Sequence, residues 1–303
     1  QEKQKKQEKT WTCPFCPDAP EGAGDWTVKQ LPNKYASLDE NAGPFQHHLF
    51  GNQITYKSAP NYGKCEVILY SQNHNASFGN LEISNIEALI RLWMKRYQVL
   101  AKYNQIQYPF IMENRGKEIG NSMLHPHGQI YAFPFLPATI SQEFQAIKEY
   151  KYKKSACMHC DIIKKELQDQ SRIIEENSHF FAEIPYYAHW AFEIHILSKR
   201  HFSSIDQLTK DEITSLAHIM KHVVQRYDIL YGKEPFMPYV MAMHNAPVNV
   251  EDRDLWHFHI EYYTPYRGPE KWKYLAGVEL GTDTYISDAL PEENAQKMRN
   301  LQI

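Results

Sequence analysis

The sequence predicts an α+β fold in which one unit occurs twice, with a mostly antiparallel sheet and helices packed on it. One observation behind this prediction is a set of short motifs that recur in the same order in the second half of the chain. Another is that each copy has one long amphipathic helix between strand-rich runs, as in α+β domains. We therefore expect two halves, at residues 1–145 and 146–303, whose sheets either stay separate or merge into one.

Each copy opens with a pair of cysteines and a strand that ends in histidine. Residues 66–74 align without gaps with residues 193–201, and both runs are rich in apolar and β-branched residues. A Cys-x-x-Cys pair precedes each strand, at residues 13–16 and 157–160. Two thiolates at this spacing suit one tetrahedral zinc ion that histidines from elsewhere complete, while a redox or disulfide pair is the alternative.

A long helix follows each of these strands. Capping boxes are expected at the starts, with Ser84 and Glu87 in the first copy and Thr209 and Glu212 in the second. Apolar side chains then recur at helical spacing, as expected for helices that pack on a sheet. These residues are Ile86, Leu89, Ile90, Trp93, Met94 and Tyr97, and then Ile213, Leu216, Ile219, Met220, Val223 and Tyr227.

A His-x-His strand closes each copy, at residues 125–127 and 257–259. Residues i and i+2 of an extended chain point to the same side, so the two imidazoles of the first copy share a face with Gln129. Gly128 allows a ligand to approach closely, and such a row of side chains can attack and bind a phosphate. The alternative is a buried strand whose histidines are only hydrogen-bonded.

Charge and composition exclude several classes of partner. The net charge of −3 provides no general basic field, so nucleic acid is not an expected partner. No apolar run approaches the roughly 20 residues of a membrane span, and no signal peptide is visible. The five cysteines form two close pairs and one single residue, which favours metal binding in a reducing compartment. We therefore expect a cytoplasmic protein.

The motifs resemble one known family over nearly the whole chain. Residues 113–116, the stretch 122–129 with its His-Pro-His-Gly-Gln, and the block 273–279 are similar to galactose-1-phosphate uridylyltransferases of the histidine-triad superfamily. The resemblance implies a duplicated histidine-triad-like unit that exchanges UMP between UDP-glucose and galactose 1-phosphate through a covalent uridylyl-histidine. It also implies a homodimer with active sites shared between subunits. Two alternatives stay open: an ADP-glucose phosphorylase or adenylyltransferase of the same superfamily, and a zinc-stabilised binding module without catalysis.

The resemblance also implies roles for individual residues. The nucleophile would be His127, and the ligands of the first zinc ion would be Cys13, Cys16, His74 and His125. Substrate contacts would come from Asn33, Asn114, Gly120, Asn121, Ser122, Gln129, Lys273, Tyr274, Val278 and Glu279. The amide of Gln129 suits transfer between phosphates rather than hydrolysis, because a phosphate leaving group needs little help from an acid.

Two ligand sets are possible for the second metal ion. The repeat predicts Cys157, Cys160, His201 and His257, the same ligand types as in the first site. Some family members instead use a glutamate and three histidines, which would be Glu143, His244, His257 and His259. Both sets share His257, so we expect two structural metal ions per chain, with zinc in the first site and zinc or iron in the second.

Overall fold

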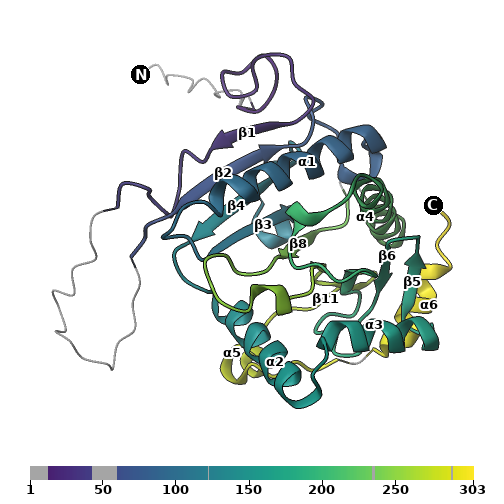
Figure 1. Ribbon diagram of the computed structural model, residues 1–303. Helices are drawn as coiled ribbons and strands as arrows, with labels where there is room; N and C mark the ends of the chain where they lie inside the picture. The colour runs from purple at the N-terminus through teal and green to yellow at the C-terminus, as the bar shows by residue number, and fades with distance from the viewer. Residues whose placement is uncertain (1–12, 43–59, 122, 234–235, 288) are drawn as a thin grey trace.

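Nine strands of the described residues form one antiparallel sheet in the computed structural model of the chain (Figure 1). The structure describes residues 13–42, 60–121, 123–233, 236–287 and 289–303. The strand order is β1-β2-β4-β3-β8-β9-β7-β6-β5. The strands are β1 (Lys29–Pro32), β2 (Lys64–Leu69), β3 (Tyr108–Arg115), β4 (His127–Phe133), β5 (Ile173–Glu176), β6 (Phe180–Glu183), β7 (Ile194–Ser198), β8 (Tyr239–His244) and β9 (His259–Tyr263). A separate two-stranded sheet pairs β10 (Tyr266–Gly268) with β11 (Lys271–Trp272).

The two halves meet where β3 pairs with β8 in the middle of the sheet. Ile111 lies opposite Met243, and Arg115 lies opposite Tyr239, in antiparallel register. The strands that begin in the His-x-His motifs, β4 and β9, are the outer neighbours of this pair. The two halves therefore share one merged sheet and do not form two separate sheets. The division of the chain at residue 145 stays a prediction.

The two long helices expected from the apolar spacing are α1 (Ile83–Leu100) and α4 (Lys210–Tyr231). They pack against each other on one face of the sheet, as Figure 1 shows. Their apolar side chains lie in the main core, together with residues such as Ile130 of β4 and Ile260 of β9. Burying this stripe is what stabilises each helix, because propensity alone contributes little.

One of the two predicted capping boxes is confirmed and the other is wrong. In the confirmed box, the Thr209 side chain accepts a hydrogen bond from the amide of Glu212. In the first copy, Glu82 is the N-cap residue and Ser84 already lies inside α1. The carboxylate of Glu87 accepts a hydrogen bond from Thr214 of α4 instead, so a contact between the helices takes the place of a local cap.

Two further helices, which the sequence patterns did not predict, cover part of the opposite face. They are α2 (Ala138–Lys154) and α3 (Met158–Asp169). Ile163 of α3 packs on Phe181 and Leu197, whose neighbours along the strands point to the main core. Two short helices, α5 (Gly277–Thr282) and α6 (Pro291–Arg299), complete the chain. In the ranges that the structure describes, no helix is long and apolar enough to cross a membrane.

Candidate active site and metal centres

His127, the expected nucleophile, is the first residue of β4 and lies opposite Leu69 of β2. Its Nδ1 is 2.8 Å from the carbonyl oxygen of His125, and because a carbonyl only accepts, Nδ1 carries the proton. The lone pair is therefore on Nε2. Burial lowers the pKa of His127 from its ordinary value of 6.5, which favours the neutral ring at pH 7. A neutral imidazole with a fixed tautomer is suited to nucleophilic attack.

The four ligands expected for the first metal ion come together beside His127. One atom each of Cys13, Cys16, His74 and His125 lies within 4.8 Å of the others. The Cys16 thiol is 3.4 Å from Nδ1 of His74 and 3.9 Å from Nδ1 of His125. Nε2 of His125 donates to the Ser71 carbonyl at 2.8 Å, which leaves Nδ1 unprotonated. Two thiols and two imidazoles are a donor set of tetrahedral zinc.

The side chain and the backbone of His125 connect this cluster to His127. The imidazole of His125 faces Cys16, while its carbonyl holds the proton on Nδ1 of His127. Phe15, from the loop between the two cysteines, packs its ring on that of His127 with 5.4 Å between centroids. A metal ion bound by the cysteine loop would therefore stabilise the position of His127 as well as the fold.

Gln129 and Asn33 lie next to each other, close to His127. Gln129 belongs to the same strand as His127 and follows it by two residues, on the same face. Asn33 directly follows β1, and its Nδ2 donates to Oε1 of Gln129 at 3.4 Å. This bond leaves the amide hydrogens of Gln129 available to an anionic ligand. The two residues that were expected to contact the nucleoside and the phosphate are thus adjacent.

The polar loop after β3 lies near His127, because Asn114 and Asn121 line the same cavity as that histidine. Nδ2 of Asn121 donates to the carbonyl of Asn114 at 2.7 Å, which ties the loop to the end of the strand. Gly120 has a φ of 85°, in the left-handed region that glycine favours, and it ends the short helical turn at 117–119. Ser122, the remaining residue expected here, lies outside the described residues.

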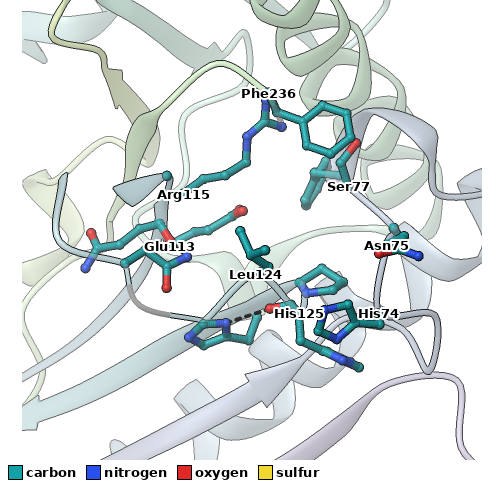
Figure 2. A pocket seen from close by; sticks show the side chains of 15 residues that line it. His74, Asn75, Ser77, Glu113, Arg115, Leu124, His125 and Phe236 are labelled. Carbon is teal, nitrogen blue, oxygen red and sulfur yellow. Dashed lines mark hydrogen bonds between the residues drawn. The ribbon is translucent and has the colours of Figure 1, made fainter. Parts of the chain in front are cut away.

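A cavity of about 340 Å³ opens between His127, the loop after β2 and the end of β3 (Figure 2). Figure 2 shows Glu113, Arg115 and Leu124 around this space. Glu113 was not among the residues expected to act, although residues 112–114 align with residues 243–245, which makes Glu113 the counterpart of His244. Its carboxyl group is buried, and Oε1 accepts a hydrogen bond from the Tyr239 hydroxyl at 3.1 Å. Burial raises the pKa of Glu113 to about 7.

The expected hexose-binding block is not brought to His127 within one chain. Lys273 and Tyr274 line a second cavity of about 410 Å³, which shares no lining residue with the first in the described ranges. The ammonium group of Lys273 donates to two backbone carbonyls, at 2.6 and 3.0 Å, and lies 3.9 Å from Glu279. The side chains of Tyr274 and Val278 are exposed.

The second cysteine pair forms a cluster of the same design as the first. Atoms of Cys157, Cys160, His201 and His257 lie within 4.8 Å of one another. Nδ1 of His257 is 3.8 Å from the Cys157 thiol and 3.6 Å from the Cys160 thiol. Its Nε2 donates to the carbonyl of Ser198 at 2.8 Å, which is the counterpart of the bond that His125 makes. The sequence repeat therefore extends to the positions and hydrogen bonds of the candidate metal ligands.

The other candidate ligand set separates from this cluster. Glu143, His244 and His259 form a group of their own, with one atom each within 4.8 Å. His257, which both sets were expected to share, belongs to the thiol group alone. The two sets were expected to be exclusive because the sequence does not show which way His257 faces.

Comparison with known proteins agrees with this geometry. Residues 1–137 match the family description "Galactose-1-phosphate uridyl transferase, N-terminal domain", and residues 143–303 match the corresponding C-terminal domain. The chain is 36% identical to galactose-1-phosphate uridylyltransferase of Thermotoga maritima, over 96% of this chain and 90% of the relative. A solved structure of a uridylyltransferase superposes with a TM-score of 0.88 at 33% identity, covering 97% of this chain and 92% of that one.

A more distant similarity connects the chain to the adenylyl branch. An ADP-glucose phosphorylase from Arabidopsis thaliana, solved with bound ADP-glucose, has a TM-score of 0.80 at 25% identity, covering 96% of this chain and 90% of that one. The matches to the uridylyltransferase descriptions cover both halves and have the higher identity. The chain belongs to the galactose-1-phosphate uridylyltransferase family.

Proposed function

We propose that the chain is a UDP-glucose—hexose-1-phosphate uridylyltransferase, which exchanges UMP between UDP-glucose and galactose 1-phosphate. The observation that carries this proposal is His127, a half-buried imidazole whose Nδ1 is held by the His125 carbonyl at 2.8 Å and whose lowered pKa favours the neutral ring. The more similar relatives carry the uridylyltransferase name, whereas the ADP-glucose enzyme is less similar.

In the first half-reaction, Nε2 of His127 attacks the α-phosphorus of UDP-glucose. A bond forms between Nε2 and phosphorus, the bond from phosphorus to the bridging oxygen breaks, and glucose 1-phosphate leaves with the electron pair. In the second, a phosphate oxygen of galactose 1-phosphate attacks the same phosphorus, which releases UDP-galactose and restores the neutral ring. Neither leaving group needs a proton near pH 7, so Gln129 only has to donate hydrogen bonds to phosphoryl oxygens.

The remaining substrate contacts are proposed from the places of the side chains. Asn33 would contact the nucleoside from the end of β1, because its hydrogen bond to Gln129 places it beside the nucleophile. The residues of the loop after β3 would hold the phosphates, through Asn114, Gly120, Asn121 and Ser122. Backbone and side-chain amides of such a loop stabilise charge on phosphoryl oxygens.

We further propose a homodimer in which Lys273, Tyr274, Val278 and Glu279 of one subunit reach the hexose that is bound at His127 of the other. Two features support this arrangement. In the described parts of one chain, Lys273 and Tyr274 line a different cavity from His127, and Tyr274 and Val278 expose apolar surface that a second copy would cover.

Zinc is the proposed ion of both thiol clusters, because two thiolates and two imidazoles match its preferred donors. Bound zinc would fix the ligands and, at the first site, the backbone that holds the nucleophile; it takes no part in the attack. The described cysteines are all free thiols, as metal binding requires. A cytoplasmic location remains the prediction of the sequence.

Intact-protein mass spectrometry tests the function. The protein is incubated separately with UDP-glucose and with ADP-glucose, without any acceptor. The expected result is a gain of one UMP with UDP-glucose, lost in His127→Gly and retained in His218→Ala, which removes an exposed histidine of α4. A gain of AMP alone would assign the chain to the adenylyl branch, and no adduct with either substrate would overturn the proposal.

A further inference from the structure

Arg115 carries the only permanent positive charge among the described residues that line the cavity of His127. It is the last residue of β3 and directly follows Asn114, one of the residues proposed to hold the phosphates. Uridylyl transfer brings the negative charges of the substrate phosphates into this cavity. Arginine is well suited to bind such groups, because its planar fork of N–H donors matches the oxygens of a phosphate.

Contacts within the protein hold the guanidinium group of Arg115 in one orientation. Its Nε donates to the Met237 carbonyl at 2.9 Å, and its Nη2 forms an ion pair with Asp228. The group also packs on two aromatic rings. Its Cζ lies 4.6 Å from the ring centroid of Tyr239 and 5.1 Å from that of Phe236, which Figure 2 shows beside the end of the arginine side chain. Because this side chain is already ordered, a ligand that it binds loses little affinity to further ordering.

One nitrogen of this guanidinium group is left without a partner. Nη1 of Arg115 is buried and makes no hydrogen bond to any residue that the structure describes. A buried donor without an acceptor is costly, and the cost is larger for a charged group. The ion pair with Asp228 does not account for Nη1, whereas an anion in the cavity would give it an acceptor.

The acidic side chains near Arg115 do not exclude an anion from Nη1. Asp228 is engaged with a different nitrogen, Nη2. Glu113 lines the same cavity, but its Oε1 accepts a hydrogen bond from Tyr239 at 3.1 Å, and burial raises its pKa to about 7. At neutral pH this carboxyl group is therefore only partly ionised, and it repels a phosphate less than an exposed glutamate would.

The order of the strands indicates which phosphate Arg115 can reach. β4, which begins with His127, lies between β2 and β3 in the sheet, and β1 is the next strand after β2. Asn33, the residue proposed for the nucleoside, follows β1, whereas Arg115 ends β3. A UDP-glucose molecule with its nucleoside at Asn33 and its α-phosphorus at His127 would therefore direct its second phosphate towards β3.

We propose that Nη1 of Arg115 donates a hydrogen bond to the phosphate of the hexose 1-phosphate, an inference that rests on the proposed uridylyl transfer. When the bond between the α-phosphorus and the bridging oxygen breaks, the electron pair stays on that oxygen and negative charge grows on the departing phosphate. A guanidinium group that is already oriented stabilises this charge as it forms. In the second half-reaction the phosphate of galactose 1-phosphate attacks from the same place, so Arg115 acts in both half-reactions.

The isolated uridylyl-enzyme tests this proposal, because its UMP can be transferred to glucose 1-phosphate or lost to water. The full chain is loaded with UDP-glucose, separated from small molecules, and mixed with glucose 1-phosphate or with buffer alone. Intact-protein mass spectrometry then follows the loss of the UMP adduct. Arg115→Gln should lower the second-order rate constant of transfer by about 100-fold, as expected for the loss of one donor to a developing charge. Hydrolysis involves no second phosphate, so its rate should stay within about twofold of the wild type.

Two matched variants separate the charge of Arg115 from its place in the fold. Lys117→Gln removes an exposed cation from the turn after β3 that is not among the described residues lining the cavity, so it should transfer UMP at the wild-type rate. Arg115→Lys keeps a charge that can pair with Asp228 but lacks the fork of donors. It should slow transfer by less than Arg115→Gln and leave hydrolysis unchanged, which also decides the question if the glutamine variant is shown by circular dichroism to be misfolded.

The proposal fails if Arg115→Gln is folded and transfers UMP as fast as the wild type. It fails as well if transfer and hydrolysis slow by the same factor, or if the glutamine and lysine variants slow transfer equally, because either result would indicate a purely structural role. A wild type that forms no adduct would instead refute the uridylyltransferase function, and the inference with it.

Discussion

Replacing Gly128 by alanine should destabilise the sheet next to His127. A Cβ atom at this position would clash with the hydroxyl of Tyr70 and would lie 2.8 Å from the Met112 carbonyl oxygen and 3.0 Å from Cζ of Tyr70. Tyr70 is fully buried in the main core, so its ring has little room to move away. Either the ring or β4 must therefore shift to accept one methyl group.

The magnitude follows from which atoms crowd the position. Overpacking a rigid core costs about 1–3 kcal/mol, and we expect Gly128→Ala to reach about 2–3 kcal/mol because one of the close atoms is backbone. Tyr70→Phe removes the nearest of the three atoms. In that background the same substitution should cost less, with a coupling free energy of about 1 kcal/mol.

Urea denaturation of the four proteins of this double-mutant cycle, at saturating zinc, measures the free energies of unfolding. Gly277→Ala is the matched control, because a Cβ there has no neighbour within 4 Å; its effect should stay within about 0.5 kcal/mol. A Gly128→Ala protein as stable as the wild type would refute the steric argument. So would an equal loss in the presence and absence of the Tyr70 hydroxyl.

Three further predictions concern titration and metal binding. Burial lowers the pKa of His127, so the single-turnover rate of uridylylation should be constant from about pH 7 to 9 and fall only in acid. A pH–rate profile whose midpoint lies above pH 7 would contradict a neutral nucleophile. Burial raises the pKa of Glu113 from 4.5 to about 7, so the folded state of the wild type loses stability as the pH rises between these values. The variant Glu113→Gln does not titrate, so its free energy of unfolding should rise relative to the wild type by up to about 3 kcal/mol across that range and by no more above it. Urea denaturation at several pH values measures this difference. Cys16→Ser and Cys157→Ser should each lose one zinc ion. Only Cys16→Ser should also slow uridylylation, because only the first cluster is connected to His127, through His125. Equal uridylylation rates in the two variants would contradict that connection.

Much of the fold follows from local patterns of the sequence. The apolar spacing predicts α1 and α4, and the repeated His-x-His motif predicts the strands that carry His127 and His259. By contrast, α2 reads Ala138–Lys154 with many Lys, Glu and Gln residues and only three buried side chains, so no clear stripe marks it. The capping box predicted at Ser84 is wrong because α1 begins before that residue, and Glu87 bonds to Thr214, a residue more than a hundred positions away.

The candidate site, too, can be predicted from the sequence only in part. Ligands within one motif, such as Cys13 and Cys16, can be paired from spacing alone, and the repeat extends that pairing to Cys157 and Cys160. The approach of Glu143 to His244 across the sheet depends on how α2 packs, which no local pattern encodes. The raised pKa of Glu113 depends on its burial beside Tyr239, a residue of the other half of the chain, and no local pattern predicts that burial.

The pairing of β3 with β8 indicates how such a chain can arise by duplication of one half. Met112 lies opposite Ala242 and Ile111 lies opposite Met243, so the two strands contact each other as two identical strands would across a twofold axis. A single ancestral half could therefore have formed the same sheet as a dimer, at a concentration-dependent cost. Joining the halves in one polypeptide replaces that cost by a fixed effective concentration, and it frees the second copy to lose catalysis while the first retains it.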